Sequence, residues 1–204
     1  MADYRSSVRY LKAADPVLAK VISAVGPCRI QIRAEGSHFQ ALARSIVFQQ
    51  LSGKAASTIH ARFNALCPGG EASPEAVLAA SDAELRSAGL SRQKMGYARS
   101  LSEQVTSGAL DLAALPADDE EAIAALTRIK GIGRWSAEIY LLFAEGRPDI
   151  FPAGDLAVQA GMGRILGLEE RPSEKHIREA SETWRPHRGA VTLLTWHCYN
   201  NAAL

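Results

Sequence analysis

Apolar residues recur along most of this chain at the spacing of amphipathic helices. They share one face from His38 to Gln50, and after a break at Leu51 the same spacing continues to Leu66. Further helical stretches are expected over residues 95–108, 118–129, 135–145, 155–166, 173–184 and 187–200. The alternation typical of strands is nearly absent, and residues 28–34 are its one faint case. The pattern therefore predicts an all-α fold of about nine or ten helices.

Local capping signals mark several of these helix ends. Ser73 followed by Pro74 predicts a helix start, because proline fits the first helical position. Ser81 and Glu84 have the spacing of a capping box, and Gly89 is a suitable residue to end that short helix. These signals place two short helices within residues 73–89.

Composition and net charge limit the possible partners of the protein but identify none. The 204 residues are 47% hydrophobic with a net charge of +1, so any nucleic-acid binding must depend on local patches. Cys28, Cys67 and Cys198 lie far apart and fit neither a disulfide framework nor metal-ligand spacing. With no leader-like start and no apolar run of about 18 residues, we expect a cytoplasmic protein without a membrane segment.

The sharpest motif spans residues 126–137, where two glycines flank one apolar residue between amphipathic helices. Gly131 and Gly133 allow a tight turn and leave backbone amides at the start of the second helix, which is a natural seat for a phosphate. An ordinary helix corner explains a bare Gly-x-Gly equally well. The surrounding Arg128, Lys130 and Arg134 favour DNA backbone, which such a turn would grip without reading its sequence.

A second signal follows about twenty residues later, where Pro152 and Gly154 lead irregularly into a helix at Asp155. Amides at this helix start should keep the Asp155 carboxylate ionised at neutral pH. Most aspartates at such a position only cap the helix, so position alone favours capping.

Together the glycine hairpin and the later Asp resemble the helix-hairpin-helix glycosylase superfamily with its Gly/Pro-rich loop and catalytic Asp. The blocks Ile46-Val-Phe-Gln-Gln-Leu-Ser-Gly-Lys-Ala-Ala56 and Gly89-Leu-Ser-Arg-Gln-Lys94-Met-Gly-Tyr97 resemble its alkylbase branch, the 3-methyladenine DNA glycosylase II group. This resemblance covers nearly the whole chain, with four blocks in the right order. It implies hydrolysis of the N-glycosidic bond of alkylated purines, of the 3-methyladenine and 7-methylguanine type, in double-stranded DNA.

The resemblance also implies roles for individual residues. Asp155 would stabilise the positive charge that builds on the sugar and orient or deprotonate water. Leu51 would be the wedge that enters the duplex and Gln50 would lean toward the opposite bases, although an interhelical core leucine and a packing amide are the alternatives. Trp135 and Trp196 would line the base pocket and bind a cationic base by stacking, whereas tryptophans on amphipathic helices are usually core.

Departures from the family pattern refine the chemistry. Glycosylases that also nick the strand carry a lysine where this chain has Trp135, so we expect a monofunctional enzyme that stops at an abasic site. Ile139 and Leu156 stand where larger relatives carry tyrosines, which leaves the lesion range open. The four clustered cysteines of other branches are missing, so we expect no iron–sulfur cluster. The family also suggests a Na+ or K+ ion on carbonyls, for which the residues are Thr127, Ile129 and Ile132.

The expected architecture is one unit over residues 1–204 with two helical lobes. A middle lobe of about residues 40–148 would carry the hairpin 126–137, and residues 1–39 with 149–204 would form the other lobe, without an added N-terminal β domain. Gly131, Gly133, Lys130, Arg134 and Thr127 would bind DNA, and Asp155 would face the cleft between the lobes. We expect a monomer with no required cofactor, associated with the nucleoid if bacterial. A non-catalytic DNA-binding module, or a glycosylase for another lesion or mismatch, is the alternative.

Overall fold

A computed structural model describes residues 4–26 and 36–200, apart from the side chain of residue 200. Its α-helices are α1 Tyr4–Ala14, α2 Pro16–Val25, α3 His38–Phe48, α4 Gly53–Ala65, α5 Pro74–Ala79, α6 Asp82–Ser87, α7 Arg92–Thr106, α8 Asp119–Leu126, α9 Arg134–Phe143, α10 Leu156–Leu166, α11 Glu174–Ser181 and α12 Arg188–Asn200. Two 3₁₀ turns are η1 Pro68–Gly70 and η2 Glu182–Trp184. The all-α prediction is confirmed over the described residues, which contain no strand.

The helix count from sequence was too low. The described residues form twelve α-helices, whereas the hydrophobic pattern indicated about nine or ten. The helices α1 and α2 were missed, although Asp15 caps α2 and Pro16 stands in its first turn, a readable start signal. The faint strand expected over residues 28–34 lies outside the described residues.

The chain divides into two compact units. Unit 1 comprises residues 1–33 and 141–204, and unit 2 comprises residues 34–140. Unit 2 overlaps the middle lobe expected over about residues 40–148, and it begins and ends several residues earlier in the chain. Unit 2 is therefore one continuous segment of the chain, inserted between the two segments of unit 1.

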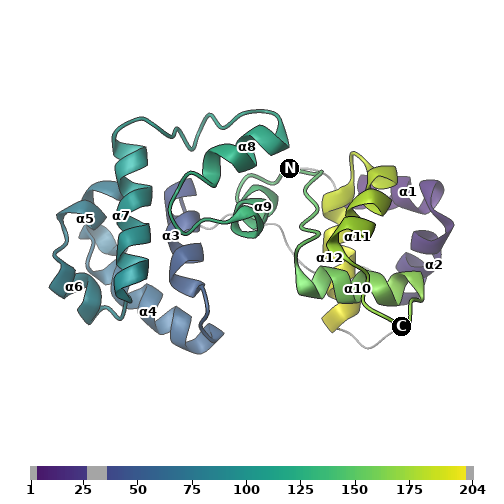
Figure 1. Ribbon diagram of the computed structural model, residues 1–204, viewed down its shortest axis with the longest axis horizontal. Helices are drawn as coiled ribbons and strands as arrows, with labels where there is room; N and C mark the ends of the chain where they lie inside the picture. Colours follow the sequence, from purple (N-terminus) through teal and green to yellow (C-terminus); the bar gives the residue numbers. More distant parts are fainter. Residues whose placement is uncertain (1–3, 27–35, 201–204) are drawn as a thin grey trace. The chain divides into compact units, whose positions relative to one another are not determined.

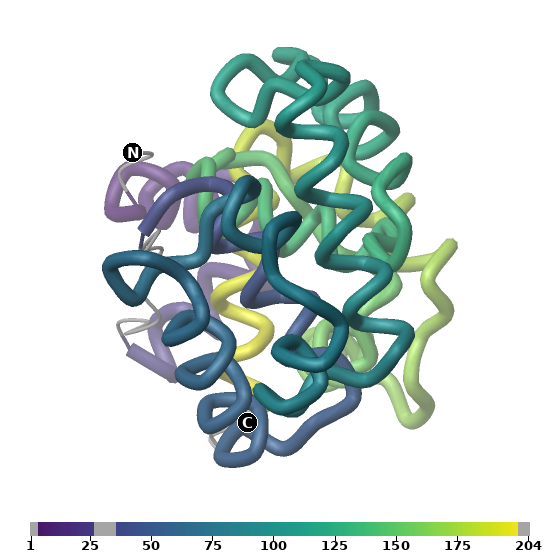
Figure 2. The backbone as a smooth tube through the Cα atoms, turned by 90° about the vertical axis from the view of Figure 1, so that its left-hand side faces the viewer, coloured from purple at the N-terminus to yellow at the C-terminus, as the bar shows by residue number. Residues whose placement is uncertain are grey.

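Unit 2 is built around α7, which packs against α3, α5 and α6 (Figure 1). In Figure 2 the blue and teal segments of α3 to α7 face the viewer. Its core includes fully buried apolar side chains from several helices, among them Leu42, Ile46, Phe63, Leu101 and Leu126. Burial of such side chains stabilises the unit by roughly 1.5–3 kcal/mol each relative to exposure. This packing holds α7 in place, together with the residues on its exposed face.

Unit 1 packs α10 against α12, with α1 and α2 covering the same core. Leu18, Met162 and Val191 are fully buried there. Trp184 is 3% exposed and belongs to this core. Its indole N–H donates to Oδ2 of Asp15 at 2.8 Å, so its one polar atom is satisfied at the start of α2.

The start of α12 is fixed by a partly buried ion-pair cluster. Asp149 accepts from Nε of Arg188 at 3.0 Å and from Arg185, and Glu182 accepts from both arginines. Arg188 and Asp149 are 8% and 9% exposed, so each needs the other to offset the loss of water. The cluster ties the segment before Phe151 to the helix that carries Trp196.

The local capping predictions hold. Ser73 accepts from the amide of Ala76 at the start of α5, and Ser81 with Glu84 forms a complete capping box on α6. These hydrogen bonds to Ser81 lower the pKa of Glu84. Among the described helices, none combines the length and the apolar character needed to span a bilayer.

Candidate active site and nucleic-acid interface

Asp155 is the N-cap of α10, as the sequence predicted. Its Oδ1 accepts from the amides of Ala157 and Val158 at 2.8 and 2.9 Å, and from the indole N–H of Trp196 at 3.4 Å. The side chain is half-buried. Three donors on one oxygen orient the carboxylate, and the helix dipole favours its negative charge.

An aromatic pair lies beside this carboxylate in unit 1. The rings of Trp196 and Phe143 stack with centroids 5.8 Å apart and an angle of 12° between their planes. Leu156, the residue after Asp155, is 62% exposed. Phe143 carries no motif signal, and sequence reasoning missed it because its partner is 53 residues away. The group offers a carboxylate next to stacked aromatic and aliphatic surface.

The hairpin in unit 2 joins α8 to α9 through residues 127–133. Ile129 and Ile132 are 1% and 3% exposed, so they anchor the turn to the core. Gly131 has φ of +86°, in the left-handed region that favours glycine. Gly133 is exposed and directly precedes α9, where backbone amides lack helical partners. The turn thus presents an exposed helix start on a buried hydrophobic base.

Helix α7 contacts the hairpin and supports it. The side-chain amide of Gln104 donates to the carbonyl of Arg128 at 3.2 Å, and the backbone amide of Lys130 donates to Oγ of Ser100 at 3.4 Å. A Cβ added at Gly131 would come within 2.2 Å of the Tyr97 ring, so this ring fills the space beside the glycine. The contacts lie along one face of α7 and hold the turn in place.

The basic residues of the hairpin have different surroundings. Lys130 and Thr127 are exposed, and the Thr127 hydroxyl donates to the carbonyl of Ala124. Arg134 donates to Glu120 at 2.8 Å and to the buried Glu138 at 3.0 Å. The hydrogen bond to Glu120, with the charges of both carboxylates, raises the pKa of Arg134. Arg134 therefore links α8 to α9, a role the sequence analysis did not predict, whereas its DNA contact stays a prediction.

Trp135 lies in the first turn of α9 and is 48% exposed. Tryptophan side chains are usually well buried. The exposure of Trp135 therefore distinguishes it from the buried Trp184 of unit 1. An indole ring with this exposure presents apolar surface to solvent. Trp135 is therefore a surface residue, and its role in a base pocket stays a prediction.

The turn between α3 and α4 carries the predicted wedge. Leu51 is 39% exposed, which rules out the alternative of a buried core leucine. Gln50 is exposed and is the one non-glycine residue with positive φ in the described chain, at +55°. The preceding Gln49 was not singled out by sequence reasoning, yet its side-chain amide donates to the carbonyl of Gly131 at 2.8 Å. This bond joins the wedge turn to the hairpin within unit 2.

The side chains that the structure describes are those of residues 4–26 and 36–199. They contain no group of three or more His, Cys, Asp or Glu that could hold a metal ion. The family resemblance suggests that the Ile129 carbonyl helps to bind a monovalent cation. This carbonyl accepts from the Ile132 amide at 3.0 Å, and a carbonyl oxygen has two lone pairs. The donor set of Thr127, Ile129 and Ile132 is all oxygen and fits a hard cation.

The candidate residues thus form two clusters. Asp155 and Trp196 lie together in unit 1, with Phe143 and Leu156 beside them. The hairpin glycines, Trp135 and the turn with Gln50 and Leu51 belong to unit 2. One cluster offers a fixed carboxylate and aromatic surface, and the other offers backbone amides, cations and an exposed apolar tip.

A two-glycine turn between helices, followed by a capping Asp, defines a helix-hairpin-helix protein of the Gly/Pro–Asp type. The family model described as "HhH-GPD superfamily base excision DNA repair protein" matches residues 43–186. The chain belongs to this superfamily.

Individual relatives narrow the resemblance. DNA-3-methyladenine glycosylase 1 of Schizosaccharomyces pombe is 32% identical over 182 residues, which cover 88% of this chain and 79% of the relative. The crystal structure of a DNA-3-methyladenine glycosidase from Bacillus halodurans matches with a TM-score of 0.89 and 36% identity, covering 97% of this chain and 90% of that one. The Schizosaccharomyces pombe 3-methyladenine DNA glycosylase in complex with abasic DNA matches with a TM-score of 0.84 and 29% identity, covering 98% of each chain.

Proposed function

We propose that this protein is a DNA glycosylase of base excision repair that hydrolyses the N-glycosidic bond of alkylated purines in double-stranded DNA. The observation that carries the proposal is the oriented Asp155 carboxylate in a chain that matches the superfamily over residues 43–186. Relatives with 32% and 36% identity are named as 3-methyladenine glycosylases. The product is an abasic site, the kind of DNA with which one related structure was solved.

The chemistry at Asp155 follows from charge. As the base leaves, positive charge builds on the sugar, and a fixed carboxylate near it lowers the barrier without having to reorganise. The same group orients or deprotonates the attacking water. Donation from Trp196 and two backbone amides to Oδ1 keeps the carboxylate in one orientation through the reaction.

The aromatic groups account for a preference for alkylated purines. A 3-methyladenine or 7-methylguanine base is cationic, and an indole face attracts it by stacking and cation–π interaction of up to about 2 kcal/mol. Trp135 and Trp196 supply these faces. Ile139 and Leu156 are aliphatic where larger relatives carry tyrosines, so we expect the lesion to be selected by its charge and its readiness to leave as much as by shape.

DNA is bound through the hairpin and the wedge turn. The amides near Gly131 and Gly133, with Lys130, Thr127 and Arg134, bind phosphates, and Leu51 fills the space that the flipped base leaves while Gln50 contacts the opposite strand. A Na+ or K+ ion on the carbonyls of Thr127, Ile129 and Ile132 would add positive charge at this turn. The protein acts as a monomer inside the cell, with no cofactor in the reaction.

Trp135 stands where strand-nicking relatives carry a lysine, so the reaction stops at the abasic site. To test this, the protein is incubated with methylated DNA, released bases are identified by chromatography, and strand breaks are scored with and without alkali. Free 3-methyladenine and breaks only after alkali are expected. Breaks that the protein makes by itself would refute the single activity.

The catalytic role is tested by Asp155→Asn with Asp118→Asn as a matched control. Asp118 caps α8 with the same pattern, its Oδ1 accepting from the amides of Glu120 and Glu121. Asparagine is as good a cap as aspartate, so both variants should fold. Loss of the charge at residue 155 should slow base release by about a hundredfold or more while DNA binding is kept. If neither variant nor the wild type releases a base, the chain is a non-catalytic DNA-binding module.

A further inference from the structure

The wedge turn has a backbone conformation that its own sequence does not favour. Gln50 is held at φ of +55°, a region that non-glycine residues rarely adopt. Such a conformation persists only where neighbouring groups fix it. Gln50 and Leu51 are both exposed, so these two side chains do not bury themselves to hold the turn. The restraint must therefore come from groups that hold the neighbouring backbone.

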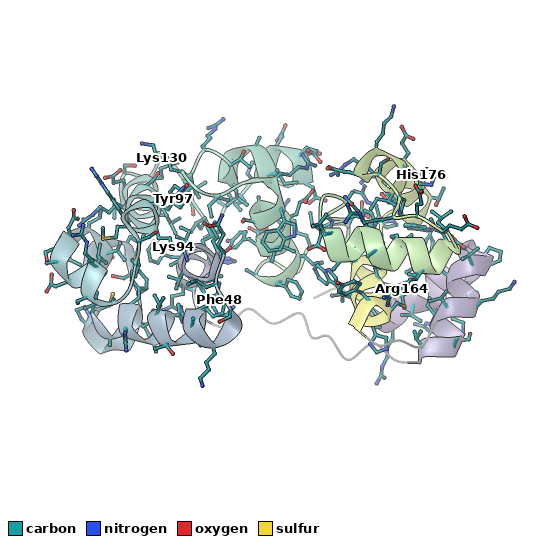
Figure 3. All side chains as sticks on the ribbon, turned by 60° about the horizontal axis from the view of Figure 1, so that its bottom comes forward. Phe48, Lys94, Tyr97, Lys130, Arg164 and His176 are labelled. Carbon is teal, nitrogen blue, oxygen red and sulfur yellow. The ribbon has the colours of Figure 1, made fainter. Side chains whose placement is uncertain are left out.

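Lys94 supplies this restraint from α7. Its ammonium donates to the carbonyls of Val47 and Gln49, both at 2.7 Å, and so joins the last turn of α3 to the residue before Gln50. Figure 3 shows Lys94 on α7 and Phe48 at the end of α3. Carbonyls at a helix C-terminus lack helical partners and carry partial negative charge, which suits a cation.

The environment of Lys94 separates it from an ordinary surface lysine. Its side chain is partly buried, and this desolvation lowers its pKa. A partly buried ammonium is retained where strong hydrogen bonds offset the loss of water, and its two short bonds to carbonyl oxygens do so. Lys94 is therefore engaged in structure within unit 2.

The same helix reaches the hairpin, one turn further along. Tyr97 packs against Gly131, and the carbonyl of Gly131 accepts from the side chain of Gln49, whose own carbonyl accepts from Lys94. In Figure 3 Tyr97 and Lys94 are labelled on α7, with Lys130 of the hairpin near its upper end. The side chain of Gln49 thus connects the wedge turn directly to the hairpin, and α7 contacts the two turns through Lys94 and Tyr97.

We propose that Lys94 is a positioning residue for base flipping, which with Gln49 fixes the turn of residues 49–52 so that Leu51 is presented to the duplex. The proposal rests on the proposed function and assigns a role to a residue that touches neither the target base nor the sugar. A turn held in advance loses less conformational entropy when it enters the DNA. Without Lys94 the turn samples other conformations and the wedge is inserted less often.

A purely structural lysine would behave differently. If Lys94 only stabilised the fold, its loss would slow excision of every substrate to the same degree. A positioning role affects the step in which a stacked, paired base leaves the helix, and that step is easier for a base that is already unpaired. The ratio of rates on paired and unpaired lesions therefore separates the two roles.

The experiment compares Lys94→Met, Lys94→Arg and, as a control, Lys20→Met, which changes an exposed lysine on α2. Single-turnover excision of 7-methylguanine is measured opposite cytosine and opposite an abasic analogue. We expect Lys94→Met to lose about tenfold or more on the paired lesion and about threefold or less on the unpaired one. Lys94→Arg, which keeps a charged donor, should retain most activity, and Lys20→Met should match the wild type.

A second measurement does not need catalysis. The fluorescence of 2-aminopurine placed opposite a tetrahydrofuran site reports insertion of the wedge at saturating protein, and Lys94→Met should reduce the change seen with the wild type. If Lys94→Met does not fold, Gln49→Leu, which removes the side-chain bond to Gly131 alone, carries the same expectation. Equal losses on both lesions, or no loss with an unchanged fluorescence response, overturn the proposal. Failure of the wild type to release any base refutes the proposed function, and the fluorescence comparison still decides the role of Lys94.

Discussion

Gly131 is the hairpin position at which one added methyl group should be most damaging. Its φ of +86° lies in the left-handed region, and an alanine there costs about 1–2 kcal/mol of backbone strain. The new Cβ would also lie 2.2, 2.3 and 2.5 Å from the Cδ2, Cγ and Cε2 atoms of Tyr97. These atoms belong to a rigid ring, so the ring or the turn must move.

The magnitude follows from adding the two effects. Overpacking of this kind costs about 1–3 kcal/mol, which together with the strain gives about 2–5 kcal/mol for Gly131→Ala. That is a large share of the 5–15 kcal/mol or so by which a typical domain is stable. Gly133→Ala is the matched control, because its Cβ would meet nothing within 4 Å and its φ is not positive. We expect it to cost no more than about 1 kcal/mol as a weaker helix cap.

Urea unfolding of both variants gives the difference directly. A double-mutant cycle with Tyr97→Leu then separates the steric part, since removing the ring should recover about 1–3 kcal/mol of the Gly131→Ala loss and leave the strain of the positive φ. Gly133→Ala should keep its stability yet bind DNA more weakly, because its methyl group projects into the open space that a phosphate would approach. Equal and small losses for the two glycine variants would refute this account of the hairpin.

Three other substitutions test separate parts of the structure. Arg188→Met leaves the buried Asp149 carboxylate short of a partner and should cost about 3–5 kcal/mol in urea unfolding, whereas a loss under about 1 kcal/mol would contradict the assigned ion pair. Burial and then the charge of Arg44 lower the pKa of His60 below its usual 6.5, so the unfolded chain binds more protons just below that pH and stability should fall as the pH drops from about 7.5 to 5.5. His60→Phe should flatten that dependence, and an unchanged slope would count against it. Trp135→Ala removes a half-exposed ring, so stability should change by less than about 1 kcal/mol while excision of a cationic base slows up to about thirtyfold; an unchanged rate would exclude Trp135 from the pocket.

Features encoded in a few neighbouring residues were predictable. The caps at Ser73 and Ser81 and the N-cap at Asp155 are local hydrogen-bond patterns, and the structure contains all three. The two glycines between amphipathic helices predicted a tight turn for the same reason. For Leu51 the resemblance implied a wedge and a buried core leucine was the alternative, and the residue is 39% exposed.

Features that depend on distant residues were not predictable from one sequence. The partners of Lys94 lie 47 and 45 positions away, and Gln49 is bonded to a carbonyl 82 positions away. Phe143 stacks on Trp196, which is 53 positions away in the sequence, so no local periodicity predicts the pair. Only the fold brings these groups together, and they include the restraints on the wedge turn.

Arg134 shows that reasoning from neighbouring residues can miss part of a side chain's role. Basic residues around the hairpin indicated phosphate contacts, but Arg134 is bonded to Glu120 and to Glu138, of which only Glu138, four positions on, was visible from spacing. Its charge is therefore largely balanced within the protein. With a net charge of +1 over the chain, the proposed attraction for DNA at this turn would depend mainly on oriented backbone amides at the start of α9, on the dipole behind them and on the exposed Arg128 and Lys130. Such a seat would be short-range, which suits the proposed step in which one phosphate is held in register while a single base is turned out.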